Sequence, residues 1–278
     1  MARARLTPRV AAAIVNGVLL GAAVVTVAPL VWMLSVSFMS PGEASAFPPP
    51  LVPGRPTLAN YRELFAHAGM GRYLVNSVVL TVAVTLLSLT LNVAAGYAFA
   101  KLPFRGRDQI FKSLLAALVI PGQVAMVPLF LLLKQLGLVN SYGGIIVPAM
   151  ASIFGIFMVR QYALSIPNEM LEAARIDGAS ELRIFRSVIV PVLKPIIVTL
   201  AVFTALGTWN DFMWPLIVLN DSDLYTLPVA LASLSREHVQ DNEMMMAGSV
   251  LTTLPVLFVF LALQRYYVDG IMLGSVKG

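Results

Sequence analysis

Six long apolar runs restrict this chain to helices that cross a membrane. A transmembrane helix needs about 20 consecutive apolar residues, and its backbone must satisfy its own hydrogen bonds in lipid. Only 12% of the 278 residues are charged, and the mean hydropathy is +0.83. We therefore predict an all-α integral membrane protein, with residues 1–278 as a single transmembrane domain. The six predicted spans cover about residues 10–38, 73–99, 110–133, 143–162, 191–219 and 246–267.

The distribution of basic residues predicts how these spans are oriented. With the N-terminus in the cytoplasm, 14 of the 19 Lys and Arg residues fall in inner segments, as is typical of cytoplasmic loops. The first apolar run far exceeds the roughly 7–15 residues of a signal-peptide core, so we expect a retained anchor. Both termini and the polar segment at residues 163–190 are then cytoplasmic, and the first outer loop, about 39–72, is rich in proline. Asn60–Phe65 in that loop is predicted to form a short interfacial helix.

The polar segment between the fourth and fifth spans reads NEMLEAARIDGASELRIFRSVIVP from Asn168 to Pro191. Pro167 suits the first turn of a helix. Gly178 can adopt the left-handed conformation that ends a helix, and Ser180 can cap the next one. We therefore predict a helix–glycine–helix at the cytoplasmic face.

The second of these helices carries an apolar pattern. Leu182, Phe185 and Ile189 recur at helical spacing and are predicted to share one face. This face would expose Phe185 unless something covers it. The pattern favours a docking element for a cytoplasmic protein over a solvated loop with modest amphipathicity.

Polar residues within the spans are candidates for a translocation path. Asp211 is the only acid in any predicted span, and an intramembrane ionisable residue indicates function. The alternative is that Asp211 caps or pairs locally near the outer interface. Pro121 and Pro128 predict a kink in the third span, either static or flexible. The candidate path residues are Asn76, Asn92, Gln123, Trp209, Asn210 and Asp211.

Several kinds of chemistry have no matching motif. The chain has no Gly-Lys pair for a phosphate-binding loop, no Gly-x-Ser-x-Gly and no cysteine. Its two histidines, His67 and His238, lack metal-ligand spacing. We predict no catalytic residue, metal or cofactor, and we interpret the net charge of +5 as a topology signal rather than as nucleic-acid binding. The outer loop at about 220–245, with Glu237, Asp241 and Glu243 among its acids, is a predicted solvated contact for an external partner.

The polar segment also resembles a known family motif. Glu172-Ala173-Ala174-x3-Gly178-x9-Val188-x-Val190-Pro191 resembles the EAA loop of inner-membrane permeases of ATP-binding-cassette (ABC) importers. The family pattern ends Ile-x-Leu-Pro, so the two valines are conservative departures. Further pieces resemble the maltose-type carbohydrate permeases: Ala95–Ala100, Ile166-Pro167, Trp209-Asn210-Asp211 and Gly274–Gly278.

This resemblance implies an ABC type I importer permease fold in the cytoplasmic membrane and the import of a sugar or oligosaccharide. It implies a second homologous permease, two ATPase subunits, an external solute-binding protein and membrane lipid as partners. In maltose-type systems the outer loop before the last span reaches into the binding protein, and the C-terminal tail lies between the ATPases. Their best-defined sugar site lies mostly on the partner permease. Residues implied in coupling to the ATPase are Glu172, Ala173, Ala174, Asp177, Gly178, Leu182 and Phe185.

Three alternatives remain at this point. One is an ABC permease for glycerol phosphate or a polyol. Another is an ion-coupled secondary carrier, which would transport without an ATPase. The third is a membrane enzyme, which the missing nucleophile–base pair disfavours.

Overall fold

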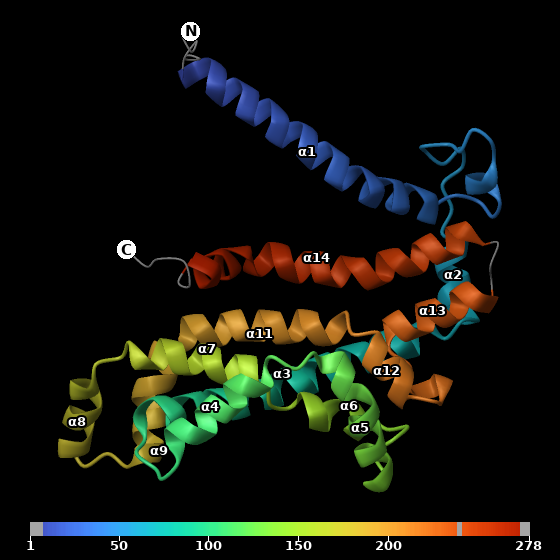
Figure 1. Ribbon diagram of the computed structural model, residues 1–278. Coiled ribbons are helices and arrows are strands. Elements are labelled where there is room, and N and C mark those ends of the chain that lie inside the picture. Colours follow the sequence, from blue (N-terminus) through green and yellow to red (C-terminus); the bar gives the residue numbers. More distant parts are fainter. Residues whose placement is uncertain (1–7, 238–240, 273–278) are drawn as a thin grey trace. The chain divides into compact units, whose positions relative to one another are not determined.

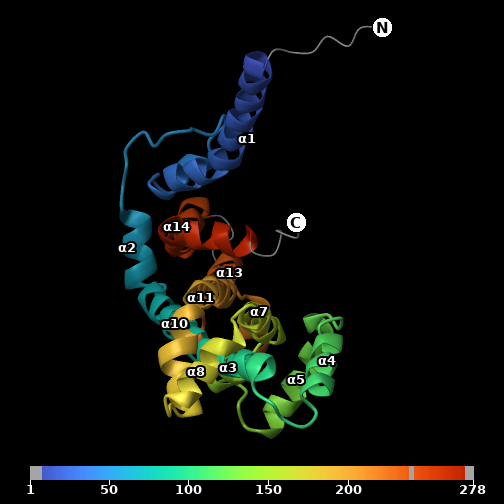
Figure 2. The same ribbon diagram turned by 90° about the vertical axis from the view of Figure 1, so that its left-hand side faces the viewer.

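The structure, a computed structural model, describes residues 8–237 and 241–272, and these residues form helices joined by turns with no strand among them (Figures 1 and 2). The chain divides into two compact units. Unit 1 holds Met1–Met70 and Leu231–Leu254, and unit 2 holds Gly71–Ala230 and Pro255–Gly278. The predicted all-α class is confirmed.

Unit 1 begins with a long apolar helix. Helix α1 runs over Pro8–Ser37, followed by the short η1 (Glu43–Ser45) and by α2 (Ala59–Ala66), which covers the short helix predicted at Asn60–Phe65. The Asn60 side-chain amide donates to the carbonyls of Ser37 and Met39, at 3.0 and 2.9 Å. These carbonyls at the end of α1 have no partner within the helix, so Asn60 fixes the start of the loop. Helices α13 (Leu227–Glu237) and α14 (Asn242–Met272) each contribute residues to both units.

Unit 2 contains most of the remaining helices. In chain order these are α3 (Met70–Lys101), α4 (Arg107–Ala117), α5 (Gly122–Gln135), α6 (Gly143–Ala149), α7 (Ile153–Leu164), α8 (Asn168–Ile176), α9 (Glu181–Ile184), the π-helical η2 (Phe185–Ile189), α10 (Val190–Val192), α11 (Lys194–Trp209), α12 (Met213–Val218) and the 3-10 helix η3 (Ser222–Leu224). Helices α3, α7 and α11 run side by side (Figures 1 and 2). Helix α8 projects past the end of α7 (Figure 1).

Four helical segments are long and apolar enough to cross a membrane: Ala12–Ser37, Met70–Lys101, Gly143–Leu164 and Asn242–Ala262. Two further segments are helix pairs with a sharp bend. Helices α4 and α5 meet at 106°, and the segment Glu181–Val192 meets α11 at 77°. The described residues thus offer four spans, or six if each bent pair is one span. The first bend lies before Pro121, whereas Pro128 lies inside α5.

A glycine allows α3 and α7 to approach closely. A Cβ added to Gly96 would lie 2.6 Å from Cβ of Val159, closer than real side chains come. Around this contact Tyr97, Val159, Ile184 and Leu193 form part of one buried core. The core joins the end of α3 to the polar segment, and so it determines where that segment sits.

Candidate functional site

The polar segment folds as the predicted helix–glycine–helix. Gly178 has φ 78° and separates α8 from α9. The amides of Gly178 and Ala179 donate to the carbonyls of Arg175 and Ala174, both at 3.0 Å, which satisfies the last turn of α8. The Ser180 hydroxyl accepts from the amide of Arg183 and caps α9. The left-handed glycine and the serine cap are both confirmed.

An ion pair links α8 to α9, and a residue of α3 contacts the same ion pair. Arg175 Nε lies 2.7 Å from Glu181 Oε1, linking α8 to α9. The hydrogen bond that Arg175 donates to the Glu181 carboxylate raises the pKa of the Arg175 guanidinium. The Tyr97 hydroxyl donates to Glu181 Oε2 at 3.4 Å, and the Tyr97 ring lies 5.4 Å from that of Phe185. The end of α3 therefore contacts the start of the second helix and η2 through both a polar and an aromatic contact.

The predicted shared face of Leu182, Phe185 and Ile189 is wrong. Leu182 is 57% exposed, Ile189 is fully buried, and Phe185 is half-buried against Tyr97. The reason is the π-helical segment η2, in which hydrogen bonds run from i to i+5. The wider turn rotates later residues relative to Leu182. Phe185 is thus covered within the chain, without a partner protein.

A second attachment holds the start of α8. Lys101 Nζ, at the end of α3, donates to the carbonyl of Ile166 at 2.5 Å and to Asn168 Oδ1 at 2.8 Å. Nearby, the Arg160 guanidinium donates to the carbonyl of Phe99 and lies 4.1 Å from the centre of the Phe111 ring. Cationic side chains therefore tie the ends of several helices together at this face.

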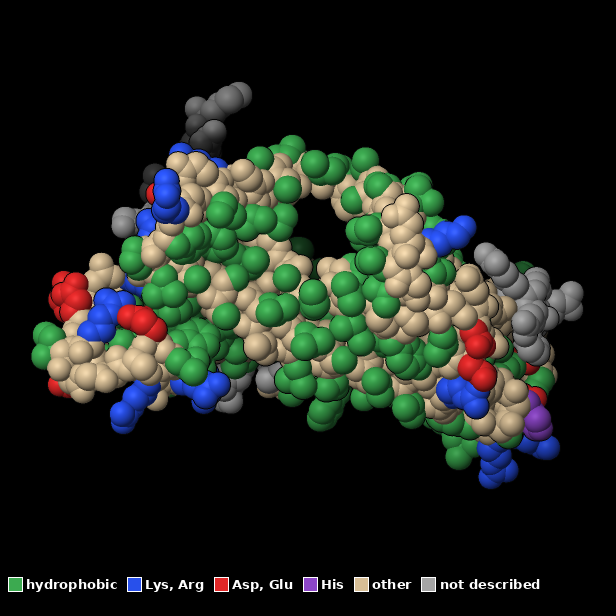
Figure 3. Space-filling view, turned by 90° about the horizontal axis from the view of Figure 1, so that it is seen from below, with side chains coloured by type: hydrophobic (Ala, Val, Ile, Leu, Met, Phe, Trp, Pro, Cys, Tyr) green, Lys and Arg blue, Asp and Glu red, His purple; other side chains and the backbone are tan. Residues whose placement is uncertain are grey.

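The other side of the helix pair exposes apolar and charged residues. Leu171 and Ala174 face the core, whereas Met170, Ala173, Ile176 and Leu182 are exposed. We call these last four the outward patch. Ile176 is 87% exposed, and neighbouring exposed apolar residues can mark a protein interaction site. Glu172, Asp177 and Arg183 are among the exposed charged residues of the same helices and the turn between them. Figure 3 shows charged side chains gathered at the end of unit 2 that carries α8 and α9. Hydrophobic side chains predominate in the middle of the same view.

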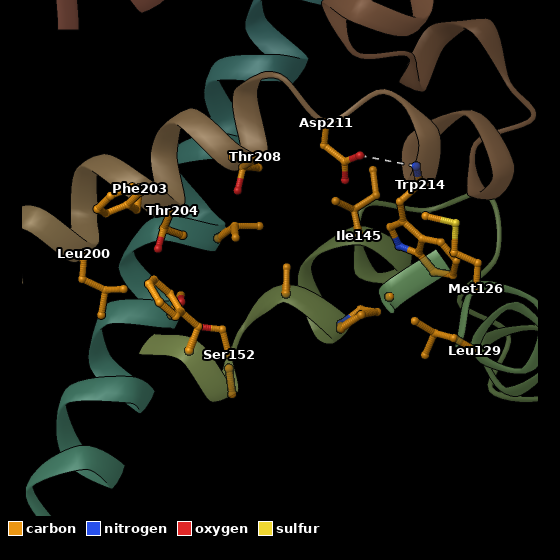
Figure 4. Close-up of a pocket in the computed structure, with 18 residues that line it drawn as sticks. Met126, Leu129, Ile145, Ser152, Leu200, Phe203, Thr204, Thr208, Asp211 and Trp214 are labelled. Carbon is orange, nitrogen blue, oxygen red and sulfur yellow. Dashed lines mark hydrogen bonds between the residues drawn. The ribbon is translucent and has the colours of Figure 1, made fainter. Parts of the chain in front are cut away.

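Unit 2 also contains a cavity of about 490 Å³. One face of α11 forms a wall of it, where Leu200, Phe203, Thr204, Gly207 and Thr208 recur at helical spacing. Figure 4 shows the labelled side chains of this face turned toward the cavity. The other lining residues come from α3, α5, α6, α7, α12 and the turns before α7 and α12: Val84, Ser88, Gly122, Met126, Leu129, Ile145, Pro148, Ala149, Ala151, Ser152, Phe154, Asp211 and Trp214.

The polar groups of the cavity are hydroxyls and one carboxylate. Asp211 is half-buried, and its Oδ1 accepts from the amide of Trp214 at 3.4 Å (Figure 4). Trp214 Nε1 donates to the carbonyl of Gly144 at 3.1 Å. The predicted local cap at Asp211 is therefore present, and the same side chain also lines the cavity. A Cβ added at Gly207 or at Gly122 would meet no atom within 4 Å, so both glycines face open space.

The other candidate path residues lie elsewhere. Asn76 donates to the carbonyls of Asp223 and Tyr225. Asn92 accepts from the amide of Ser152 at 3.0 Å and stabilises the break between α6 and α7. Gln123 and Asn210 are exposed, and neither lines the cavity. Trp209 is buried and lines a separate apolar pocket of about 310 Å³.

Sequence reasoning missed the hydroxyl groups on α11. Thr204 and Thr208 lie one helical turn apart with Gly207 between them, and Asp211 follows three residues later. This spacing was a usable signal. It is weak alone, because α11 carries a further hydroxyl, that of Thr199, which does not line the cavity.

The outer loop before α14 is only partly the predicted solvated surface. Glu243 is fully buried, and its Oε1 accepts from the amide of Ala44 at 2.7 Å. Asp221 and Asp223 are exposed, and Asp223 pairs with Arg72. His238 and the tail Gly274–Gly278 lie outside the described residues.

Residues 92–272 match a family described as binding-protein-dependent transport system inner membrane component. Among curated proteins, the chain is 39% identical over 227 residues to the arabinooligosaccharides transport system permease protein AraQ of Halalkalibacterium halodurans, covering 81% of each chain. It is 33% identical over 261 residues to the lactose transport system permease protein LacG of Rhizobium radiobacter, covering 92% of this chain and 93% of that one.

A solved structure has the same fold. A bacterial ABC transporter involved in the import of the acidic polysaccharide alginate contains a chain that superposes with a TM-score of 0.83 and 25% identity. The match covers 96% of this chain and 100% of that chain.

Proposed function

Because the chain belongs to the family of binding-protein-dependent transport system inner membrane components, we propose that it is the permease subunit of an ATP-driven importer of a neutral sugar or oligosaccharide. The observation that carries this proposal is the exposed helix–glycine–helix of α8 and α9 in a chain of this family. Relatives named for arabinooligosaccharide and lactose transport support the substrate class.

The outward patch is the proposed docking surface for an ATPase subunit. Its four apolar residues would bury surface in a groove of the partner, worth about 25 cal/mol per Å². Glu172, Asp177 and Gly178 fix the charge and the path of the helix pair beside it. Phe185, which packs on Tyr97, would instead transmit a push on α9 to α3.

The cavity is this subunit's proposed share of the substrate path. Ser152, Thr204 and Thr208 supply hydroxyls, and the Asp211 carboxylate accepts hydrogen bonds from sugar hydroxyls. The edge-to-face rings of Phe154 and Phe203, 6.4 Å apart, supply apolar surface. Among the residues that the structure describes, none that lines the cavity is basic, which disfavours glycerol phosphate and acidic sugars.

The remaining machinery would come from partner proteins. A second, homologous permease would complete the path, two ATPase subunits would bind at the cytoplasmic face, and a solute-binding protein would deliver the sugar from outside. In this arrangement both termini and the α8–α9 pair are cytoplasmic. ATPase closure would move helices as rigid bodies and alternate access to the cavity.

Reconstitution of the whole complex tests the proposal. The chain is co-expressed with the permease, ATPase and binding-protein genes found beside its own, purified, and placed in liposomes. We expect uptake of a labelled neutral sugar that requires ATP and the binding protein, with no dependence on an imposed ion gradient. Uptake that follows a proton or sodium gradient without ATP would favour a secondary carrier. Preferential uptake of a phosphorylated or acidic solute would contradict the substrate class alone.

A further inference from the structure

The proline-rich segment Phe47–Pro53 folds back along the end of α1. The Ser35 hydroxyl donates to the carbonyl of Leu51 at 2.6 Å. Leu51 and Val52 line a groove together with α1 residues from Ala23 to Trp32. Trp32 lies five residues before the end of α1, so the segment returns by about 7 Å along the helix axis at 1.5 Å per residue.

This return brings the segment to the depth of a membrane-spanning helix. Ala12–Ser37 is long and apolar enough to cross a membrane, and within its most apolar window no residue is buried inside the chain. Ser35 and Trp32 both belong to that span. Whatever surrounds the last turns of α1 must therefore also surround Leu51 and Val52.

The side chains of the segment suit lipid. Phe47 is 98% exposed, Leu51 76% and Val52 72%, so three large apolar residues face outward from one short stretch. The groove that Leu51 and Val52 share with α1 has a volume of about 590 Å³ and is lined by apolar residues throughout. Trp32 at its edge is the residue type that concentrates at membrane–water interfaces.

The backbone of the segment suits the membrane interface. Irregular backbone is excluded from lipid because unpaired N–H and C=O groups are costly there. Four of the seven residues Phe47–Pro53 are proline, which leaves only three N–H donors. The carbonyl of Leu51 has its partner in Ser35. The other carbonyls of the segment still need hydrogen-bond partners, which water and lipid headgroups supply at the membrane interface.

Hydrogen bonds to the Glu43 side chain connect the two ends of this loop. The Glu43 carboxylate accepts from the amide of Gly54 at 2.6 Å and from that of Ser40 at 2.9 Å. These backbone donors, that of Gly54 first, lower the pKa of the Glu43 carboxyl. The charged group and the donor-rich backbone lie at the base, and the apolar, donor-poor stretch forms the tip.

We propose that Phe47–Pro53 is a membrane anchor at the C-terminal end of α1, with its backbone at the membrane interface and the side chains of Phe47, Leu51 and Val52 in contact with lipid acyl chains. This proposal does not rest on the transport function or on which side of the membrane is outer. The competing possibilities are that the segment contacts the solute-binding protein or that the second permease covers it.

Site-directed spin labelling in the assembled transporter tests the anchor, because the chain contains no cysteine. Phe47→Cys and Val52→Cys are labelled with a nitroxide in separate variants in liposomes. Arg55→Cys, exposed in the same loop, is the matched control. Collision rates with oxygen, which concentrates in lipid, are compared with those of a water-soluble nickel chelate.

We expect oxygen collisions to exceed nickel collisions at positions 47 and 52 and to fall below them at position 55. Nickel-dominated collisions at 47 and 52 would place the segment in water and overturn the proposal. Protection from both reagents would mean a protein cover, and would overturn it equally. Assembly of each variant is judged by ATPase co-purification. If either Phe47→Cys or Val52→Cys does not assemble, the collision rates of the remaining variant test the proposal.

Discussion

At the scale of single residues, the cavity wall on α11 combines hydroxyl groups with an unfilled position. Gly207 faces open space between the Thr204 and Thr208 turns. Asp211 lies at the end of the same face and also caps the turn to Trp214. A larger side chain at Gly207 can therefore be accommodated with little effect on the surrounding core.

Filling the cavity at Gly207 is expected to block transport. Gly207→Leu puts an isobutyl group into the cavity, and removal of a helical glycine gains up to about 1 kcal/mol, so folding should not suffer. We expect sugar uptake to fall on the order of tenfold, equivalent to about 1.4 kcal/mol. Gly207→Ala adds only a methyl group and should keep near-normal uptake. Equal uptake by all three proteins would remove the cavity from the substrate path.

Removing the charge of Asp211 is expected to leave the energy source unchanged. Asp211→Asn keeps the size and the acceptor that caps Trp214. We expect substantial ATP-dependent uptake in vesicles at any imposed pH gradient, with a raised KM for sugar because one acceptor in the cavity is weaker. Gradient-driven uptake in the wild type that disappears in the variant would instead identify a proton carrier.

At the scale of secondary-structure elements, the helix pair α8–α9 is held on its inner side and exposed on its outer side. Tyr97 and Lys101, both on the last turns of α3, hold its two halves. Gly178 joins the halves in a conformation that costs other L-residues about 1–2 kcal/mol. The pair is therefore a semi-rigid unit whose shape depends on a single glycine.

Strain at Gly178 is expected to uncouple transport. A Cβ at this position meets nothing within 4 Å, so Gly178→Ala tests backbone conformation alone. Gly42→Ala is the matched control, because Gly42 has φ 83° and equal space but lies in the loop after α1. We expect Gly178→Ala to reduce sugar uptake several-fold more than Gly42→Ala, since about 1–2 kcal/mol of strain falls on the helix pair. Gly178→Pro, which excludes positive φ, should be more severe.

The control readout is the amount of ATPase that co-purifies with each variant, together with its ATP hydrolysis. Normal uptake and normal co-purification in both Gly178 variants would contradict the docking role of the pair.

Local signals predicted part of this element and of the fold. Apolar runs predicted the helical class, and glycine and serine preferences predicted the ends of α8 and α9, because both depend on a few neighbouring residues. Proline likewise predicted a kink in the third span, and a 106° bend lies directly before Pro121. The π-helical turn at Phe185–Ile189 has no such local signal in the sequence. For the same reason, the apolar pattern of α11 could not indicate which of its faces lines a cavity.

At the scale of the whole molecule, the proposed function depends on which side of the membrane each segment occupies. The distribution of basic residues predicts that the N-terminus and the α8–α9 pair share one side. That side must be the cytoplasm if an ATPase binds there.

Single cysteines can test this topology in the otherwise cysteine-free chain. Ser180 and Ser222 are both exposed, so accessibility within the protein is matched. An impermeant thiol reagent applied to intact cells should label Ser222→Cys and spare Ser180→Cys, and lysed cells should label both. The reverse pattern would place α8 and α9 outside and end the docking proposal.

The two attachments of the α8–α9 pair to α3 limit how this protein can be recombined with its relatives. A chimera that exchanges only residues 168–191 would leave Lys101 and Tyr97 facing foreign partners for Asn168 and Glu181. Such a hybrid should recover ATPase coupling only when the last turns of α3 are exchanged along with the segment. The smallest transplantable piece is therefore discontinuous in the sequence and larger than the motif by which the segment is recognised.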